Sequence, residues 1–531
     1  MAADPSPPDP PDPPDPPAAL VGRTAWVATQ VSGATPVGNV LKVPGDRKKD
    51  DQARWFSAGT DDVGRPMNPA RPGNEVKYLI DGAQAFEEMA RVMLQARARG
   101  DFIYLANWWF TGAIQPLAGS SQTLDGILRE ASRAGVLIRA LFWDQQFSTQ
   151  NSQGVRDINA LANGGAVLDD VGNESLPIVN LPYHVGSQHQ KILCVQADGA
   201  LTAFVGGVDW NPDRIEFHSG TSSSGGAGDP LHDVHCRIRG PAARDVVQTF
   251  LDRWNDSSRR RDLPVAKQTA ITPALPAPVA GPEGRHVVQI GRTLGTYGYG
   301  FAPRGERTAR ELILRAIGNA RRFIYTEDQY FVGNDEVRRA LAAALPRIQH
   351  FTAVITPQEA SDLPEGGPHR RDFIQFLRQI GGDKVRILAL DPPHAIHTYV
   401  HAKIWIIDDE FVSIGTVNCN RRGYTHDSEI VAGLWESSSD ERLMLRLAHW
   451  LRIKLWAEHF GFRPWQFTPD RQPSEAELLA YAELADGVAS AVHFKVPPAG
   501  ARIKVYDEFG AGVGHAPTVD TLLWENFADP A

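Results

Sequence analysis

The sequence predicts an α/β protein made of two similar α/β/α halves, each a mostly parallel or mixed sheet covered by helices. Apolar, β-branched runs typical of buried strands alternate with amphipathic helical segments along the chain. The order of these segments repeats after about 212 residues, a period far too long for a solenoid of short repeats. The repetition therefore predicts two related domains that lie against each other.

The first half begins with a helix predicted over residues 83–100. Phe86, Met89 and Met93 fall on one helical stripe there, and Gly100 ends it. Strands and helices then alternate, and apolar strands separated by helices are typical of a covered sheet. The predicted strands are 102–110, 136–144, 189–196 and 201–210, and the predicted helices are 123–135 and 240–255.

The second half repeats the same order. A helix predicted at 307–320 precedes an apolar strand, FIYTEDQYF, whose first three residues match those of FIYLANWWF in the first half. The later predicted strands are 351–357, 385–391, 401–408 and 411–418, and the later predicted helices are 334–346, 371–382 and 440–461.

Composition sets the expected domain boundaries. Residues 1–20 are rich in proline and aspartate, which predicts a disordered tail, and residues 256–284 contain a Pro/Ala-rich stretch typical of a linker. We therefore expect a first half at 21–255, with its core from about residue 74, and a second half at 285–464. Residues 465–531 form a C-terminal extension to which the sequence assigns no role.

The composition also argues against several classes of protein. A net charge of −9 disfavours a nucleic-acid partner, because phosphate neutralisation needs a basic surface. Three cysteines, Cys194, Cys236 and Cys419, are too few for a disulfide framework, and no cysteine–histidine cluster has zinc spacing. The sequence shows neither a secretory signal nor an apolar run of about 18 residues, so we expect a protein that is cytoplasmic or secreted by a non-classical route. We also expect this protein to be a monomer.

One rare pattern occurs once in each half, as His189-Gln190-Lys191 and His401-Ala402-Lys403. Each segment lies on an apolar run that predicts a buried strand, and residues two apart on a strand share a face. Two such strands brought together would place two imidazoles beside two ammonium groups. That set suits attack on a phosphodiester, so we expect an active site at the interface of the halves.

The text around the second segment makes the pattern more specific. His401, Lys403 and Asp408 fit HxK(x4)D, and Asn418 lies in the GTVN turn that follows. This region resembles the phospholipase D superfamily, and the resemblance covers roughly residues 74–461. Segments such as FIYTEDQYF and LRIKLWAEHFG are closest in style to plant and other eukaryote-type phospholipases D.

The resemblance implies a two-step phosphodiesterase reaction through a phosphohistidine. By the family pattern His189 is the nucleophile and His401 the general acid and base, an order that the residues alone leave open. The family pattern also implies that Lys191, Lys403 and Asn418 hold the phosphate oxygens, and that Asp233 and Glu429 hold the histidine tautomers. No metal or other cofactor is expected, because the lysines supply the positive charge.

The first half departs from the pattern at two places. Gln196 stands where Asp408 stands in the second half, and Asp209 stands where the second half has Asn418. Asp408 lies an odd number of residues after His401, so strand alternation predicts that it faces away from the imidazole and is structural. On that interpretation Gln196 weakens the local structure but leaves the chemistry possible.

We therefore expect a phospholipase D that hydrolyses glycerophospholipids to phosphatidic acid and also transfers the phosphatidyl group to alcohols. Its partner would be a phospholipid surface, which the protein contacts peripherally. The alternatives are another phosphodiesterase of the superfamily, such as a nuclease or a phospholipid synthase, a lipid-binding pseudoenzyme, and a contact-delivered antibacterial lipase effector.

Overall fold

The computed structural model describes residues 50–144, 149–169, 186–214, 216–217, 221–222, 231–272, 275, 284–296, 299–356, 366–390, 398–436, 447–459 and 503–505. The predicted tail at 1–20 lies outside these residues, as does all but 503–505 of the C-terminal extension. No helix within the described residues is both long and apolar enough to cross a membrane.

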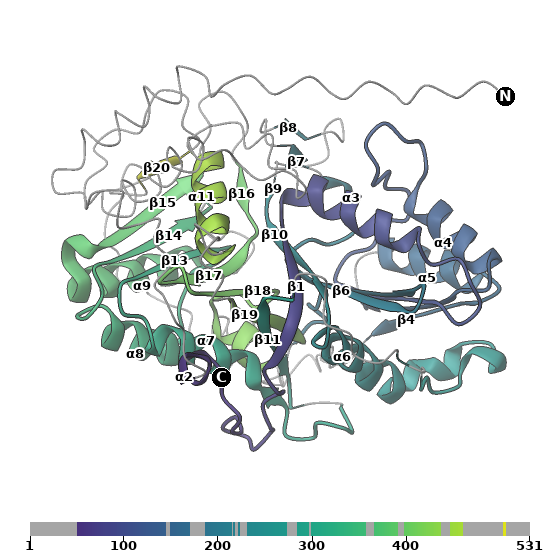
Figure 1. Cartoon of the computed structure of the whole chain (residues 1–531), viewed down its shortest axis with the longest axis horizontal. Coiled ribbons are helices and arrows are strands. Elements are labelled where there is room, and N and C mark those ends of the chain that lie inside the picture. Colours follow the sequence, from purple (N-terminus) through teal and green to yellow (C-terminus); the bar gives the residue numbers. More distant parts are fainter. Residues whose placement is uncertain are drawn as a thin grey trace, which may run out of the picture.

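Seven strands of the first half form one end of a large mixed sheet (Figure 1). Their spatial order is β1-β10-β6-β5-β2-β3-β4, in which β2, β3 and β4 are parallel and the others antiparallel. The bounds are β1 Arg71–Ile80, β2 Phe102–Asn107, β3 Leu137–Trp143, β4 Gly164–Asp169, β5 Ile192–Ala197, β6 Ala200–Gly206 and β10 Val234–Arg239.

The second half repeats this topology strand for strand, in the order β11-β19-β18-β17-β13-β14-β15, and β20 adds an antiparallel edge. The bounds are β11 His286–Leu294, β13 Phe323–Asp328, β14 His350–Ile355, β15 Val385–Leu390, β17 Lys403–Ile407, β18 Phe411–Gly415, β19 Glu429–Glu436 and β20 Ile503–Val505. The five remaining strands are short: β7 Glu216–Phe217, β8 Thr221–Ser222, β9 Leu231–His232, β12 Glu306–Arg307 and β16 Tyr399–Val400.

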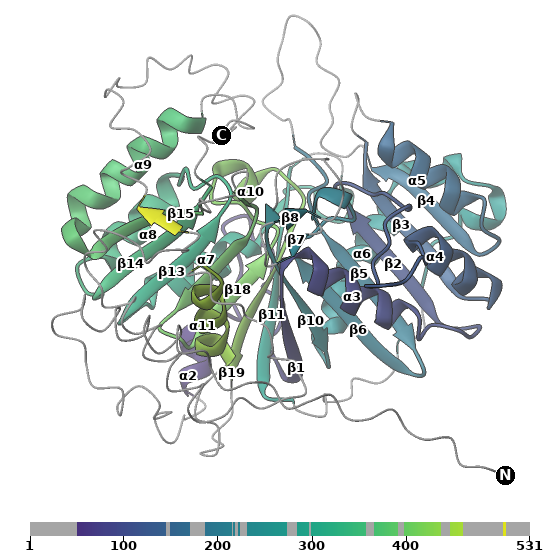
Figure 2. The same cartoon turned by 90° about the horizontal axis from the view of Figure 1, so that it is seen from above.

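The two halves join through β1 and β11, which pair antiparallel and lie side by side in the middle of both views (Figures 1 and 2). The pairing contains an irregularity between Arg71 and Asn74. The sheet therefore runs from one half into the other, and the expected pair of similar α/β halves is confirmed.

Helices cover both faces of each half. On the first half α3, α4 and α5 pack on one face and α6 on the other; on the second half α7, α8 and α9 pack on one face and α11 on the other. The bounds are α3 Asp81–Met93, α4 Leu124–Arg133, α5 Gln150–Asn159, α6 Ala243–Asp256, α7 Thr308–Gly318, α8 Asp335–Ala344, α9 Gly366–Gly381 and α11 Leu447–His459. Two short helices, α2 Asp50–Trp55 and α10 Arg421–Thr425, complete the set among the described residues.

Local sequence signals explain several helix starts. Thr123 caps α4 by accepting from the peptide N–H of Gly126, and Asn334 caps α8 by accepting from Val337. The predicted helix over 83–100 ends earlier, at Met93, since the chain turns there before it enters β2.

Two segments near the predicted boundaries pack against the halves. Trp55 of α2 stacks on Phe411 of the second half with ring centroids 5.3 Å apart, although it precedes β1, the first strand of the first half, in the chain. Within the predicted linker, residues 258–262 and 265–267 form 3-10 turns, and Leu263 and Ile271 are buried in the central core.

Candidate active site

Each histidine–lysine segment is bound by the opposite half of the molecule. The peptide N–H of His189 donates to the carbonyl of Ser428 at 3.0 Å, and that of His401 donates to the carbonyl of His232 at 2.8 Å. Both histidines lie just before strands β5 and β17 rather than on them, which differs from our prediction. The reason is that the backbone at each histidine bonds across the interface before it enters its own sheet.

A carboxyl group from the opposite half orients each imidazole. Nδ1 of His189 lies 2.9 Å from both carboxylate oxygens of Glu429, the first residue of β19. Nδ1 of His401 lies 2.7 Å from Oδ2 of Asp233, between β9 and β10. When Nδ1 donates to the carboxylate, Nε2 keeps its lone pair, so the chemistry of both rings falls to Nε2.

The charges of the two halves act on each other at this point. Burial, Lys191 and Lys403 all lower the pKa of His189 well below its usual value. Burial lowers the pKa of His401 in the same way, followed by Lys403, Arg214, Lys191 and His189. Side chains of both halves therefore share one electrostatic environment, as the pattern of two histidines and two lysines predicts.

Both lysines are buried next to their histidines. Nζ of Lys191 donates to the carbonyl of His189 at 3.0 Å and lies 3.2 Å from Oδ2 of Asp209. Nζ of Lys403 donates to the carbonyl of His401 and, at 2.8 Å, to Oε1 of Gln329. Burial lowers the pKa of Lys403 to about 7.

The supporting carboxyl groups are also shielded from water. Burial raises the pKa of Asp233 to about 7 and raises the pKa of Glu429 well above its usual value. Desolvation thus disfavours charge on both members of each histidine–carboxyl pair. A neutral imidazole is the form that can attack phosphorus.

The turn after β6 explains how Asp233 fits. A Cβ atom on Gly207 would lie 2.0 Å from Oδ1 of Asp233, so only glycine leaves room for this carboxyl group. Thr416 takes the matching place in the second half, where its side chain hydrogen-bonds to Glu429 and lowers the pKa of that carboxyl group against the effect of burial. The Gly-Gly and Gly-Thr turns are therefore part of the site.

Asp209, which lies next to Lys191, also accepts hydrogen bonds from the end of the segment that follows β2. Its Oδ1 accepts from the peptide N–H groups of Trp108 and Trp109 at 2.9 and 3.1 Å. Trp108 also stacks on Trp143 and meets His189 edge-on, with ring centroids 6.3 Å apart. An aromatic wall thus borders the first histidine.

The second half exchanges the aspartate and the asparagine. Asn418 follows β18 where Asp209 follows β6, while Asp328 ends β13 where Asn107 ends β2. Asp328 accepts from the peptide N–H of Cys419 at 2.9 Å and raises the pKa of Lys403 against the effect of burial. Each half therefore has one buried carboxyl group near its lysine. In the first half it follows β6, and in the second half it ends β13.

Sequence reasoning missed Asp328 and Gln329. Both lie in FIYTEDQYF, which we interpreted as a buried strand and as part of the family resemblance, without assigning a role to any of its side chains. The available signal was a run of polar residues at the end of an otherwise apolar strand, which is unusual for side chains that are buried.

Asp408 lies at the far end of β17 from Lys403, about 16 Å along the strand. Its carboxylate accepts from the peptide N–H groups of Arg321, Arg322 and Phe323 at 2.7 to 2.9 Å and bonds Arg54 at 2.7 Å. In this structure Asp408 therefore stabilises a turn. It lies too far along the strand to contact the imidazole of His401.

Gln196 occupies the matching place in the first half. Its amide Nε2 donates to the carbonyl of Gly100 at 3.2 Å. Gln196 thus donates this hydrogen bond, whereas Asp408 accepts hydrogen bonds from three peptide N–H groups. This position is also remote from the histidines, because it lies near the far end of β5.

Comparisons with known proteins show which family the sequence resembles. A family model described as phospholipase D matches residues 210–343, and one described as cardiolipin synthase, PLD-like domain, matches residues 313–450. Phospholipase D alpha 1 of Vigna unguiculata is 24% identical over 72% of this chain and 65% of its own length. Phospholipase D alpha 1 of Arabidopsis thaliana is 23% identical over 71% of this chain and 64% of its own length.

The chain thus spans about 65% of the length of these relatives. A solved structure of phosphatidylserine synthase from Haemophilus influenzae covers 70% of this chain and 84% of its own, at 14% identity and a TM-score of 0.46. That structural likeness is too weak to add to the sequence matches. The family matches and the paired histidine–lysine segments show that the chain belongs to the phospholipase D superfamily.

Proposed function

We propose that this protein is a phospholipase D that hydrolyses glycerophospholipids on the headgroup side of the phosphate. The observation that carries the proposal is the reciprocal support of the two histidines. Each imidazole is fixed by a carboxyl group of the other half, and two buried lysines lie beside the pair. This arrangement offers two reactive nitrogens and two cations to one phosphodiester.

In the first step Nε2 of His189 attacks phosphorus and forms the P–N bond. The bond between phosphorus and the headgroup oxygen breaks, and His401, which must enter this step protonated on both ring nitrogens, gives its Nε2 proton to that oxygen. Lys191 and Lys403 offer their ammonium groups to the non-bridging oxygens, where negative charge increases in the transition state. The choice of His189 as nucleophile follows the superfamily resemblance.

In the second step water attacks the phosphohistidine. His401 accepts the proton of the water, the P–N bond breaks, and His189 leaves as a neutral imidazole. The product is phosphatidic acid. A primary alcohol that replaces water would give the corresponding phosphatidyl alcohol.

The overall charge supports a lipid substrate over a nucleic acid. A protein with a net charge of −9 repels a long polyanion, whereas a single phosphodiester needs only the local cations of the site. The similarity to plant phospholipases D supports the same choice.

The proposal is tested with vesicles that contain labelled phosphatidylcholine or phosphatidylethanolamine. The wild type should release headgroup, while His189→Ala and His401→Ala should each lose activity by about 10³-fold or more. His350→Ala, which removes a half-buried histidine stacked on Phe323, is the matched control and should keep wild-type activity. Brief exposure to lipid labelled in the phosphatidyl group should leave an acid-labile, base-stable label on His189.

Three results would contradict the proposal. Full activity in either histidine variant would exclude the paired mechanism. Nicking of supercoiled plasmid without headgroup release would identify a nuclease. Vesicle binding without turnover would identify a lipid-binding protein that lacks catalysis.

A further inference from the structure

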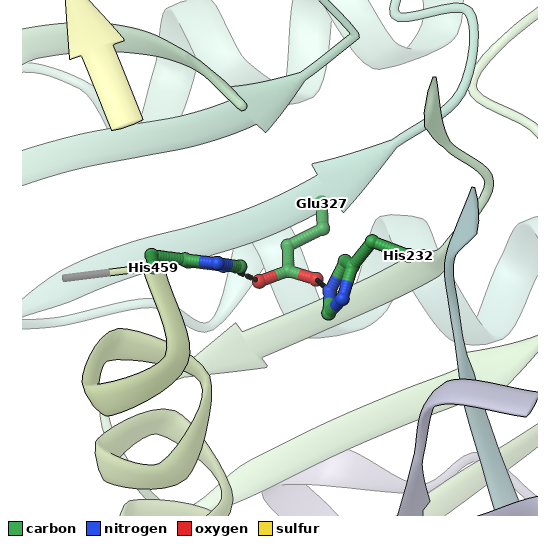
Figure 3. A group of neighbouring side chains, drawn as sticks. All are labelled: His232, Glu327 and His459. Atoms are coloured by element: carbon green, nitrogen blue, oxygen red, sulfur yellow. Dashed lines mark hydrogen bonds and ion pairs between the residues drawn. The ribbon is translucent and has the colours of Figure 1, made fainter. Parts of the chain in front are cut away.

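A second cluster of buried polar side chains lies beside the site and takes no part in the proposed reaction. Its five members are fully or almost fully buried: Asp81 at the start of α3, His232 on β9, Glu327 on β13, and Glu458 and His459 at the end of α11. Figure 3 shows His232 and His459 on either side of the Glu327 carboxylate.

The geometry brings two nitrogens to one carboxylate. Nε2 of His232 lies 2.7 Å from Oε2 of Glu327, and Nε2 of His459 lies 2.8 Å from Oε1 of the same residue (Figure 3). One ligand atom from each of the three residues lies within 4.8 Å of the other two. A small outward shift of these atoms would make room for one metal ion at ordinary bond lengths of about 2.0–2.2 Å.

The other side of His232 is held by two more carboxyl groups. Nδ1 of His232 lies 2.9 Å from Oδ1 of Asp81 and 3.3 Å from Oε1 of Glu458. A carboxylate on the far nitrogen of a histidine fixes its tautomer and raises its basicity, as in many metal sites.

Charge gives an independent argument. The cluster contains three carboxyl groups and two imidazoles, all shielded from water. Buried carboxylates are costly unless cations compensate them, and a divalent ion supplies two positive charges at one point.

We propose that His232 Nε2, Glu327 and His459 Nε2 form a binding site for a divalent transition metal, for which Zn²⁺ is the best fit. Two imidazoles and one carboxylate are a common zinc ligand set, whereas Mg²⁺ and Ca²⁺ prefer oxygen ligands. Asp81 and Glu458 hold His232 from behind and are not ligands of this ion.

The site would stabilise the interface of the halves. His232 belongs to the first half, Glu327 to the second, and His459 to the last turn of α11. The carbonyl of His232 accepts the peptide N–H of His401. A metal here would therefore position the strand that meets His401 and would take no part in the chemistry.

The test uses full-length, untagged protein stripped with a chelator and titrated with Co²⁺. We expect about one equivalent to bind and to give the visible absorption bands of a low-symmetry site, and Zn²⁺ to displace it. Zn²⁺ should also raise the Tm of the stripped protein, because a ligand that binds only the folded state stabilises it. A hydrogen-bonded network without metal would show no Co²⁺ bands and no change in Tm, which would overturn the proposal.

Glu327→Gln and His459→Gln should each abolish the Co²⁺ bands. His449→Gln is the matched control, because His449 is buried on the same helix but contacts Asp409 outside the cluster. Wild-type binding in both cluster variants, or equal loss in His449→Gln, would refute the assignment. The wild-type titration decides the question even where a variant fails to fold, and it needs no phospholipid, so its outcome is separate from that of the headgroup-release assay.

Discussion

At the scale of single residues, the site depends on partners that lie far away in the sequence. His189 and Glu429 are 240 residues apart, and His401 and Asp233 are 168 apart. Support crosses the interface in both directions, so neither His189 nor His401 takes its carboxyl partner from its own half. A structural defect in either half would therefore affect the imidazoles of both His189 and His401.

Glu429→Gln tests this dependence. The amide cannot accept from Nδ1 of His189 with the strength of a carboxylate and disturbs the tautomer, so kcat should fall by about 10²- to 10⁴-fold. KM should change much less, because Glu429 lies behind the ring and not against the phosphate. Initial rates of headgroup release from vesicles give both constants.

Glu436→Gln provides the control for this substitution. Glu436 is a buried glutamate on the same strand, β19, but it lies at the opposite end and accepts from the peptide N–H of Leu447. Its rate constants should stay close to those of the wild type. An equal loss of kcat in both variants would indicate general damage to β19.

At the scale of elements, the turn after β17 shows how one carboxylate can organise a strand end. Asp408 has a φ of 56°, which aspartate tolerates better than most residues, and it accepts from three consecutive peptide N–H groups. In the first half Gln196 lies on β5 opposite Leu201 and donates a single hydrogen bond, while the chain turns at Asp198 and Gly199. The two halves therefore differ both in the length of this turn and in the number of hydrogen bonds that hold it.

Asp408→Asn should lower the free energy of unfolding by about 2 kcal/mol, because a charged acceptor of backbone N–H groups and of Arg54 becomes neutral. The kcat of the folded variant should stay within about twofold of the wild type, since the turn is about 16 Å from Lys403 along the strand. Urea unfolding and headgroup release measure the two effects.

Asp198→Asn is the matched control for that substitution. Asp198 has a φ of 49° in the equivalent region of the first half but is exposed, so its variant should change stability by less than about 0.5 kcal/mol. A large loss of activity in Asp408→Asn with unchanged stability would show that Asp408 takes part in the chemistry.

At the scale of the whole molecule, the junction of the two sheets creates the electrostatics of the site. Both lysines, both histidines, Arg214 and Arg422 come from the two halves and lie close enough for their charges to lower the histidine pKa values, which makes each additional positive charge costly. The pKa of Lys403 falls to about 7, chiefly through burial. A lysine on one isolated half would not experience this combination.

The pH dependence of kcat/KM should reveal that lysine. Lys403 carries its charge below pH 7 and loses it above, so kcat/KM of the wild type should fall above about pH 7 by about tenfold per pH unit. Lys403→Arg keeps its charge throughout, so its residual kcat/KM should stay flat over the same range. The same alkaline decline in both proteins would assign it to another group.

The sequence alone determined the repeated α/β order and the pairs of histidines and lysines, and it supplied the seven residues expected in the site. The repeated order follows from local periodicity and the histidine–lysine pairs from motif spacing, whereas the roles of Asn418, Asp233 and Glu429 are what the resemblance to the superfamily implies. Only the tertiary structure decided that the supporting carboxyl groups are exchanged between halves. It also decided that Asp328 and Gln329 line the site, and that His232, Glu327 and His459 meet. Those contacts join strand ends that the sequence separates by up to 240 residues, and their formation depends on how the two sheets join at β1 and β11, which no local pattern encodes.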